Sequence, residues 1–228
     1  LKDAVLPFNT PLVGPDGEDG NWGVRFVWGD AFNGSIGSLR SALEILQRSD
    51  APDFEGQVLD TTASVAHIND ARGSLFPDFL EYPDDVLDGD EWDGEDHIVS
   101  YKGTLRIKEA GDYTFGVNTD DGFGLRIFGA EFKSESGKAT IDALQPNSLV
   151  HPGTEGNTDS RGTVNLAAGD YGIEFIWYER GGGDKGILYF AKGDFEFDED
   201  ADPGDVESGE WELVGNDHLV GAATVPFQ

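Results

Sequence analysis

Short strand-like runs punctuated by glycine constrain the fold of this chain more than any other feature. The run 22–28 places Trp22, Val24, Phe26 and Trp28 on one face, and residues 113–117 alternate aromatic or branched side chains with small ones. Runs of this kind, separated by turns in a chain with 32 glycines, are typical of an all-β sandwich or barrel. We expect strands at residues 22–28, 98–107, 111–119, 124–128, 161–166, 169–178 and 186–191, and further strand segments at 211–214 and 219–227.

One segment has a different period. Residues 38–47 carry apolar side chains at intervals of three and four, which predicts one short accessory helix packed on the sandwich. No internal repeat is present. We therefore expect residues 1–228 to form a single domain, with a core at about 20–195 and a C-terminal segment, 196–228, that returns to the sandwich.

The composition is strongly acidic. Fifteen basic residues stand against 45 acidic ones, for a formal net charge of −30. This charge opposes binding to nucleic acid or anionic membranes and favours divalent cations. The chain has no cysteine, no methionine and no long apolar run, so we expect no disulfide and no membrane insertion. We interpret it as a module of a longer secreted protein or as a processed form.

Adjacent aspartates, Asp120 and Asp121, lie at a turn between two strand-like runs and are followed by Gly122. Neighbouring carboxylates repel each other unless they are solvated or neutralised, and such pairs beside glycine suit Ca²⁺. A solvated acidic turn is the alternative. The acidic stretch 84–93 allows the same two interpretations, and a solvated loop is favoured for it. The stretch 198–205 is not an EF-hand, because proline occupies the position that needs glycine, and either stretch could hold a secondary, structural Ca²⁺.

The order of the motifs resembles that of the PA14 domain family. The resemblance runs through residues 101–107 and 110–115 to the aspartate pair, and then through 166–179 and 181–190. It covers roughly residues 98–192, and more loosely the chain from about residue 20. The stretch 51–55 is also similar to the fibro-slime variants of the family.

The resemblance implies a metal site. In the carbohydrate-binding branch of the family, found in microbial adhesins, two adjacent aspartates joined by a cis peptide bond hold one Ca²⁺; Asp120 and Asp121 match them. A second loop, here residues 179–186, adds a side-chain ligand that is usually an amide, and its counterpart here is Asp184. An aspartate at this position would bind Ca²⁺ more tightly than an amide. The ion would then attract sugar hydroxyls less strongly. The family pattern adds the carbonyls of Gly186 and Leu188, with Asn118 or Asn157 as reserve amides.

The resemblance also implies a function, that of a Ca²⁺-dependent lectin module in an adhesin, active in cell adhesion and biofilms. Asp120, Asp121, Gly183 and Asp184 would contact the sugar. Arg180 and Lys185 would donate hydrogen bonds to its hydroxyls, unless they are simply solvated cations. The expected partners are cell-surface or extracellular glycans, and the expected protein is a monomeric module of a bacterial surface. A structural spacer or protein-interaction module, and the targeting module of a polysaccharide-degrading enzyme, are the alternatives.

No catalytic motif accompanies these features. The four histidines, His67, His97, His151 and His218, show no zinc-binding spacing, and neither a GxSxG nor a Walker sequence is present. The glycines at 181–183 precede no predicted helix, so they do not form a phosphate-binding loop. We therefore expect a binding protein rather than an enzyme.

Overall fold

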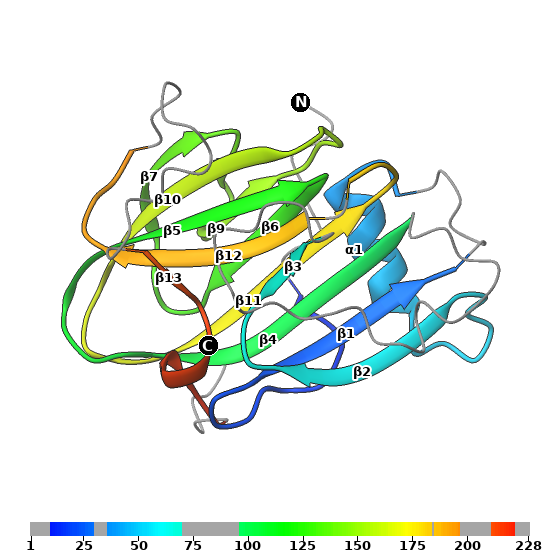
Figure 1. Ribbon diagram of the computed structural model, residues 1–228, viewed down its shortest axis with the longest axis horizontal. Helices are drawn as coiled ribbons and strands as arrows, with labels where there is room; N and C mark the ends of the chain where they lie inside the picture. Colours follow the sequence, from blue (N-terminus) through cyan, green and yellow to red (C-terminus); the bar gives the residue numbers. More distant parts are fainter. Residues whose placement is uncertain (1–9, 30–35, 70–95, 184, 197–210, 222–228) are drawn as a thin grey trace.

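Two antiparallel sheets packed face to face form the body of the molecule (Figure 1). The computed structural model describes residues 10–29, 36–69, 96–183, 185–196 and 211–221. The eight-stranded sheet has the order β2-β1-β4-β11-β6-β9-β8, with β14 paired to β4. The six-stranded sheet has the order β13-β12-β5-β10-β7, with β3 paired to β12.

The first seven strands along the chain are divided between the two sheets. Their bounds are β1 Trp22–Trp28, β2 Gln57–Ala63, β3 His67–Asn69, β4 His97–Ile107, β5 Gly111–Asp120, β6 Gly122–Ile127 and β7 Phe132–Gly137. The remaining elements are β8 Thr140–Asp142, β9 Gln145–His151, β10 Thr158–Leu166, β11 Gly169–Glu179, β12 Lys185–Lys192, β13 Glu212–Leu213, the 3₁₀ turn η2 Asn216–His218 and β14 Leu219–Val220.

This architecture confirms the prediction of an all-β fold with one helix. The sequence pattern missed β2, β3 and β7–β9, because those strands carry few apolar residues; the sequence of β7, for example, is FKSESG. The two C-terminal segments are shorter than expected, since β13 and β14 have two residues each. Residues 222–227 of the predicted last segment lie outside the described residues.

Aromatic side chains fill the space between the sheets. Tyr101 stacks on Phe175 at a centroid distance of 5.7 Å and makes a T-shaped contact with Trp22 at 5.9 Å. Trp22 is fully buried, and its Nε1 donates a hydrogen bond of 2.9 Å to the carbonyl of Val214. The C-terminal segment is thereby tied to the centre of the sandwich.

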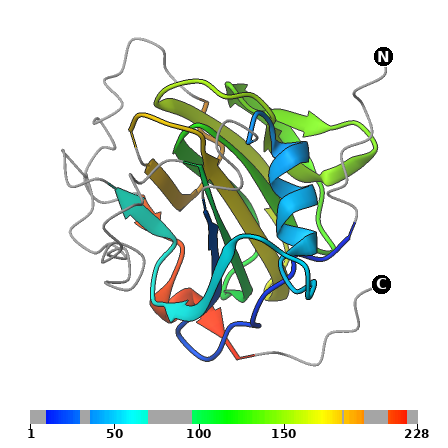
Figure 2. The same ribbon diagram turned by 90° about the vertical axis from the view of Figure 1, so that its right-hand side faces the viewer.

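The helix α1, Leu39–Arg48, lies against the outer face of the eight-stranded sheet (Figure 2). It begins at a capping box in which Ser38 and Ser41 satisfy each other's backbone N–H groups. Its buried side chains are the four that set the predicted period, Leu39, Ala42, Leu43 and Leu46. The observed helix is therefore the predicted one, displaced by a single residue.

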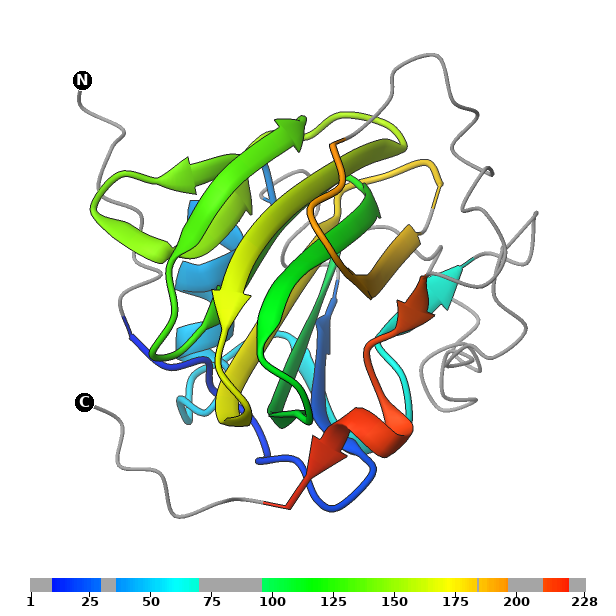
Figure 3. The ribbon, with the colours of Figure 1, turned by 90° about the vertical axis from the view of Figure 1, so that its left-hand side faces the viewer.

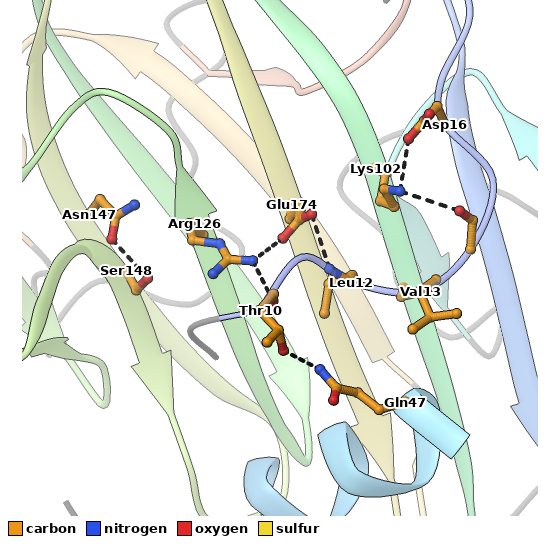
Figure 4. A network of polar contacts seen from close by, with 12 residues as sticks. Thr10, Leu12, Val13, Asp16, Gln47, Lys102, Arg126, Asn147, Ser148 and Glu174 are labelled. Atoms are coloured by element: carbon orange, nitrogen blue, oxygen red, sulfur yellow. Dashed lines mark hydrogen bonds and ion pairs between the residues drawn. The ribbon is translucent and has the colours of Figure 1, made fainter. Parts of the chain in front are cut away.

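Residues 10–16 run along the same outer face, held by polar contacts (Figure 4). Arg126 on β6 and Glu174 on β11 are register partners and form an ion pair, with side chains only 3% exposed. Arg126 also donates to the carbonyl of Thr10 at 2.8 Å, and Glu174 accepts the N–H of Leu12 at 3.1 Å. The segment therefore covers the buried ion pair and adds one hydrogen bond to each of its two side chains.

Replacing Arg126 alone should destabilise the protein severely. Arg126→Met leaves the Glu174 carboxylate buried without its cation, which should lower the free energy of unfolding by about 3–5 kcal/mol. The double variant Arg126→Met/Glu174→Leu should recover much of that loss. Denaturant unfolding measures both, with Arg106→Met at the exposed pair with Asp170 as a control that should change little. Equal losses in the Arg126 and Arg106 variants would contradict the assignment.

Candidate metal and ligand site

The two aspartates lie where the chain crosses from one sheet to the other. Strand β5 ends at Asp120 in the six-stranded sheet, and β6 begins at Gly122 in the eight-stranded sheet (Figure 1). The peptide bond between Asp120 and Asp121 is cis, the geometry that the resemblance implies. A Cβ atom on Gly122 would lie 2.3 Å from the hydroxyl of Tyr178 and 2.4 Å from the carbonyl of Gly153, so only glycine fits after the pair.

Asp121 is fixed by the backbone of β11 and the loop that follows. Its N–H donates to the carbonyl of Tyr178 at 3.1 Å, and its Oδ2 accepts the N–H of Arg180 at 2.9 Å. The residue is 4% exposed. Burial raises the pKa of Asp121, the Arg180 N–H opposes that shift, and the neighbouring charge of Asp120 adds to it. A bound cation would offset both unfavourable contributions.

Asp120 is more open to solvent. It is half-buried, and its Oδ2 accepts the N–H of Asn157 at 3.1 Å. Two glycines lie close to this oxygen, because Cβ atoms on Gly183 and Gly156 would come within 3.2 and 3.9 Å of it. The carboxylate therefore lies between the two loops that carry these glycines.

A third carboxylate joins the pair. Glu179, the last residue of β11, is fully buried, and its Oε1 accepts the N–H of Gly181. One carboxylate oxygen from each of Asp120, Asp121 and Glu179 lies within 4.8 Å of the others. Oxygens that ligate Ca²⁺ at 2.3–2.6 Å can be about 5 Å apart across the ion, so the arrangement fits a calcium shell.

Glu179 was not predicted as a ligand, because within residues 179–186 the side-chain ligand was assigned to Asp184. The available signal was an acidic residue that directly ends a long apolar run and precedes three glycines. Asp184, the predicted ligand, lies outside the described residues. So do the acidic stretches 84–93 and 198–205. Within the described ranges, the three carboxylates are the one cluster of three or more potential metal-ligating side chains.

The other predicted residues divide into two groups. Arg180 and Gly183 lie beside the cluster, and Lys185 pairs with Asp120 in the sheet register while its Nζ donates to Asn157 Oδ1 at 3.4 Å. Asn157 contacts Asp120 through its backbone N–H rather than through its amide.

The second group lies further into the sheet. Leu188 pairs with Val117, and its carbonyl accepts the N–H of Val214 at 3.1 Å; the role of this carbonyl as a ligand stays a prediction. Gly186 pairs with Thr119, one position from Asp120, where a Cβ atom would lie 2.3 Å from the Trp177 ring. Asn118 is buried and donates a side-chain hydrogen bond to Asp159, and its role as a reserve amide stays a prediction.

The described histidines do not assemble into a metal site. His97 packs edge-on against Trp177 at 5.0 Å, and His218 pairs with Glu212 at 3.1 Å. His151 is buried, and burial lowers its pKa. The side chain of His67 is not among those described.

The fold and the cluster together define a β-sandwich domain with a carboxylate site at a crossing between its sheets. The family model described as "PA14 domain" matches residues 83–195, and this part of the chain belongs to that family. No curated protein matches the sequence. No helix among the described residues has the length and apolar character needed to cross a membrane.

Solved structures resemble the chain at low sequence identity. The PA14 domain of the antifreeze protein MpAFP is 17% identical, with 93% of this chain and 96% of that chain covered and a TM-score of 0.51, which supports the fold. A PA14 sugar-binding domain from an RTX adhesin is 21% identical, with 56% of each chain covered and a TM-score of 0.36. The Epithelial Adhesin 9 A domain from Candida glabrata, solved with Galβ1-4GlcNAc, is 12% identical, with 82% and 91% covered and a TM-score of 0.40.

The close packing around the aspartate turn can be tested with a single methyl group. Gly122→Ala places a Cβ atom within 2.6 Å of three oxygens, those of Tyr178, Gly153 and His151. Such overpacking should lower the free energy of unfolding by about 1–3 kcal/mol. Gly37→Ala, whose Cβ meets nothing within 4 Å, is the control. A Gly122→Ala protein as stable as the control would show that the turn is looser than described.

Proposed function

We propose that this chain is a Ca²⁺-dependent carbohydrate-binding module of a larger secreted or cell-surface adhesin. The observation that carries the proposal is the convergence of Asp120, Asp121 and Glu179 within 4.8 Å at the crossing between the sheets. Membership of the PA14 family supports it. The RTX adhesin domain named as sugar-binding and the epithelial adhesin solved with a disaccharide show the kind of ligand to test.

Different residues of the chain would bind the ion and contact the sugar. The carboxylates of Asp120, Asp121 and Glu179 would hold the ion, and the backbone N–H groups of Arg180 and Gly181 donate to two of these carboxylates. Calcium accepts six to eight oxygen ligands, so it supplies positions at which two vicinal sugar hydroxyls can replace water. Arg180, Gly181 and Gly182 are exposed, which leaves the loop side of the cluster accessible to a glycan.

Selection among sugars would rest on the neighbouring donors. The Arg180 side chain is exposed, and the Lys185 ammonium lies beside Asn157 next to Asp120. Both can donate to hydroxyls that the ion does not ligate. Because exchange of water for hydroxyl is nearly balanced, affinity for one sugar should be micromolar to millimolar, and adhesion or biofilm formation should require many copies. Asp184 stays a predicted additional ligand.

Calcium should stabilise the protein. Ca²⁺ that binds the folded state alone raises the melting temperature by mass action, and a chelator should lower it again. Mg²⁺ should substitute poorly, because it requires a small octahedral shell and releases its waters reluctantly. Calorimetry with each cation and with chelator makes the comparison. An unchanged transition, together with no heat on titration of Ca²⁺, would remove the proposed metal site.

Glu179 should contribute to the affinity for Ca²⁺ as Asp121 does. Glu179→Gln and Asp121→Asn each keep the shape of the side chain but remove one negative charge, so each should weaken Ca²⁺ binding on the order of tenfold or more. Glu131→Gln, which removes an exposed charge away from the cluster, should leave the affinity unchanged. Isothermal titration measures all three. Full affinity in Glu179→Gln would exclude Glu179 as a ligand.

Sugar binding should depend on the ion. A glycan array should show Ca²⁺-dependent binding to sugars with accessible diols, such as fucose, mannose, glucose or galactose, and removal of one hydroxyl of the diol should abolish it. Arg180→Ala and Lys185→Ala should change which sugars bind while Ca²⁺ affinity stays the same. A protein that takes up Ca²⁺ yet retains no glycan at millimolar concentration would instead be a structural spacer.

A further inference from the structure

A cavity of about 830 Å³ lies at the opposite end of β5 and β12 from the carboxylates. Its lining includes Tyr113 and Lys192, which are register partners near the start of β5 and at the end of β12. Asp120 and Lys185 are partners at the other end of the same two strands. Seven residues of extended strand span about 24 Å, so the cavity is separate from the metal site.

Aromatic rings form one wall of this cavity. Phe190 stacks on Tyr113 at 6.1 Å, and Phe195 lies 5.4 Å from Trp211, measured between ring centroids. Figure 3 views the side of the molecule on which the C-terminal segment that begins with Trp211 lies. Arg161, which does not line the cavity, lies over the Trp211 ring at 4.8 Å from its centroid, and Trp211 and Phe195 are both half-buried, so a ligand can meet only the remaining surface of the two residues. Such rings offer a large, rigid apolar surface.

Most charged groups around the cavity already have partners. Arg106 donates two hydrogen bonds of 2.8 Å to Asp170, Lys192 contacts Glu109 at 2.5 Å, and His218 contacts Glu212 at 3.1 Å. Two lining residues differ. Lys108 and Asp217 are exposed, and neither makes a hydrogen bond or ion pair with any described residue. As far as the described residues show, the cavity thus presents one charged side chain that can donate, Lys108, and one that can accept, Asp217.

We propose that this cavity binds a neutral pyranose unit of a glycan, independently of calcium. The apolar face of the sugar ring would lie on Trp211 and Phe195, while its hydroxyls would accept from Lys108 and donate to Asp217. Pockets that combine aromatic walls with a few polar groups are typical ligand sites. A neutral ligand fits, because an anion would also meet Glu109, Glu212 and Asp217, and a cation would meet Arg106, Lys108 and Lys192.

The experiment uses the whole protein in excess chelator, so that the carboxylate site is empty of metal. Cellohexaose, maltohexaose and a neutral galactan oligosaccharide are titrated at millimolar concentration by calorimetry. At least one should bind, Trp211→Ala should weaken that binding tenfold or more, and Trp211→Phe should weaken it less, because it keeps an aromatic ring. Lys108→Ala should weaken it severalfold. Lys138→Ala is the matched control, since Lys138 is exposed and pairs with Glu155 outside the cavity.

Three results would overturn the proposal. The first is no binding of any of these sugars in chelator, and the second is binding that appears only with Ca²⁺, which would leave the carboxylate site supported. The third is binding that Trp211→Ala and Lys108→Ala leave unchanged in proteins whose circular dichroism matches the wild type. If Trp211→Ala fails to fold, the affinities of Trp211→Phe and Lys108→Ala for the oligosaccharide test the proposal instead. Wild-type affinity in both of these variants would refute the site.

Discussion

The register between β6 and β11 is the constraint on which the carboxylate cluster depends. Tyr178 lies opposite Gly122, so the Tyr178 carbonyl receives the Asp121 N–H, and the next two residues of the chain bring Glu179 and the Arg180 N–H to the aspartate. Side chains alternate between the two faces of a sheet, so a slip of one residue would turn Glu179 away from the pair. The positions of the three carboxylates therefore depend first on the pairing of β6 with β11 and only then on the loops.

The buried ion pair occupies the same pair of strands. Arg126 lies opposite Glu174, four positions along the ladder from Gly122 and Tyr178. A slip of one residue would separate the two charges, and each would then meet an apolar neighbour such as Ile127 or Ile173. A buried polar pair can contribute little net stability and still specify one arrangement. We offer that role here as a hypothesis: the pair and the segment at residues 10–16 select the register that assembles the site.

Strand alternation located the aspartate pair at a strand end, because the inward-facing residues on both sides of it are apolar and regularly spaced. The same reasoning failed where apolar residues are scarce, as in β7, and for the partner in the second loop. Glu179 was not predicted, because an acidic residue at the end of an apolar run does not by itself show that the end of β11 lies against the turn after β5. The Leu188 carbonyl was assigned from the family pattern, and that pattern does not show that Leu188 lies opposite Val117 and accepts the N–H of Val214. The surroundings of both Glu179 and Leu188 are set by contacts between segments that lie far apart in the sequence.

The two proposed sites are held apart by the same two strands. The pairing of β5 with β12 is continuous from Asp120 and Lys185 to Tyr113 and Lys192, so no flexible linker separates the sites (Figure 1). A rigid spacing raises the effective concentration at the second site only for a glycan that can span the interval, because a ligand that cannot reach gains nothing. A short oligosaccharide should therefore occupy either site alone. Only a chain long enough to bridge about 24 Å, or two chains on one surface, can gain from both.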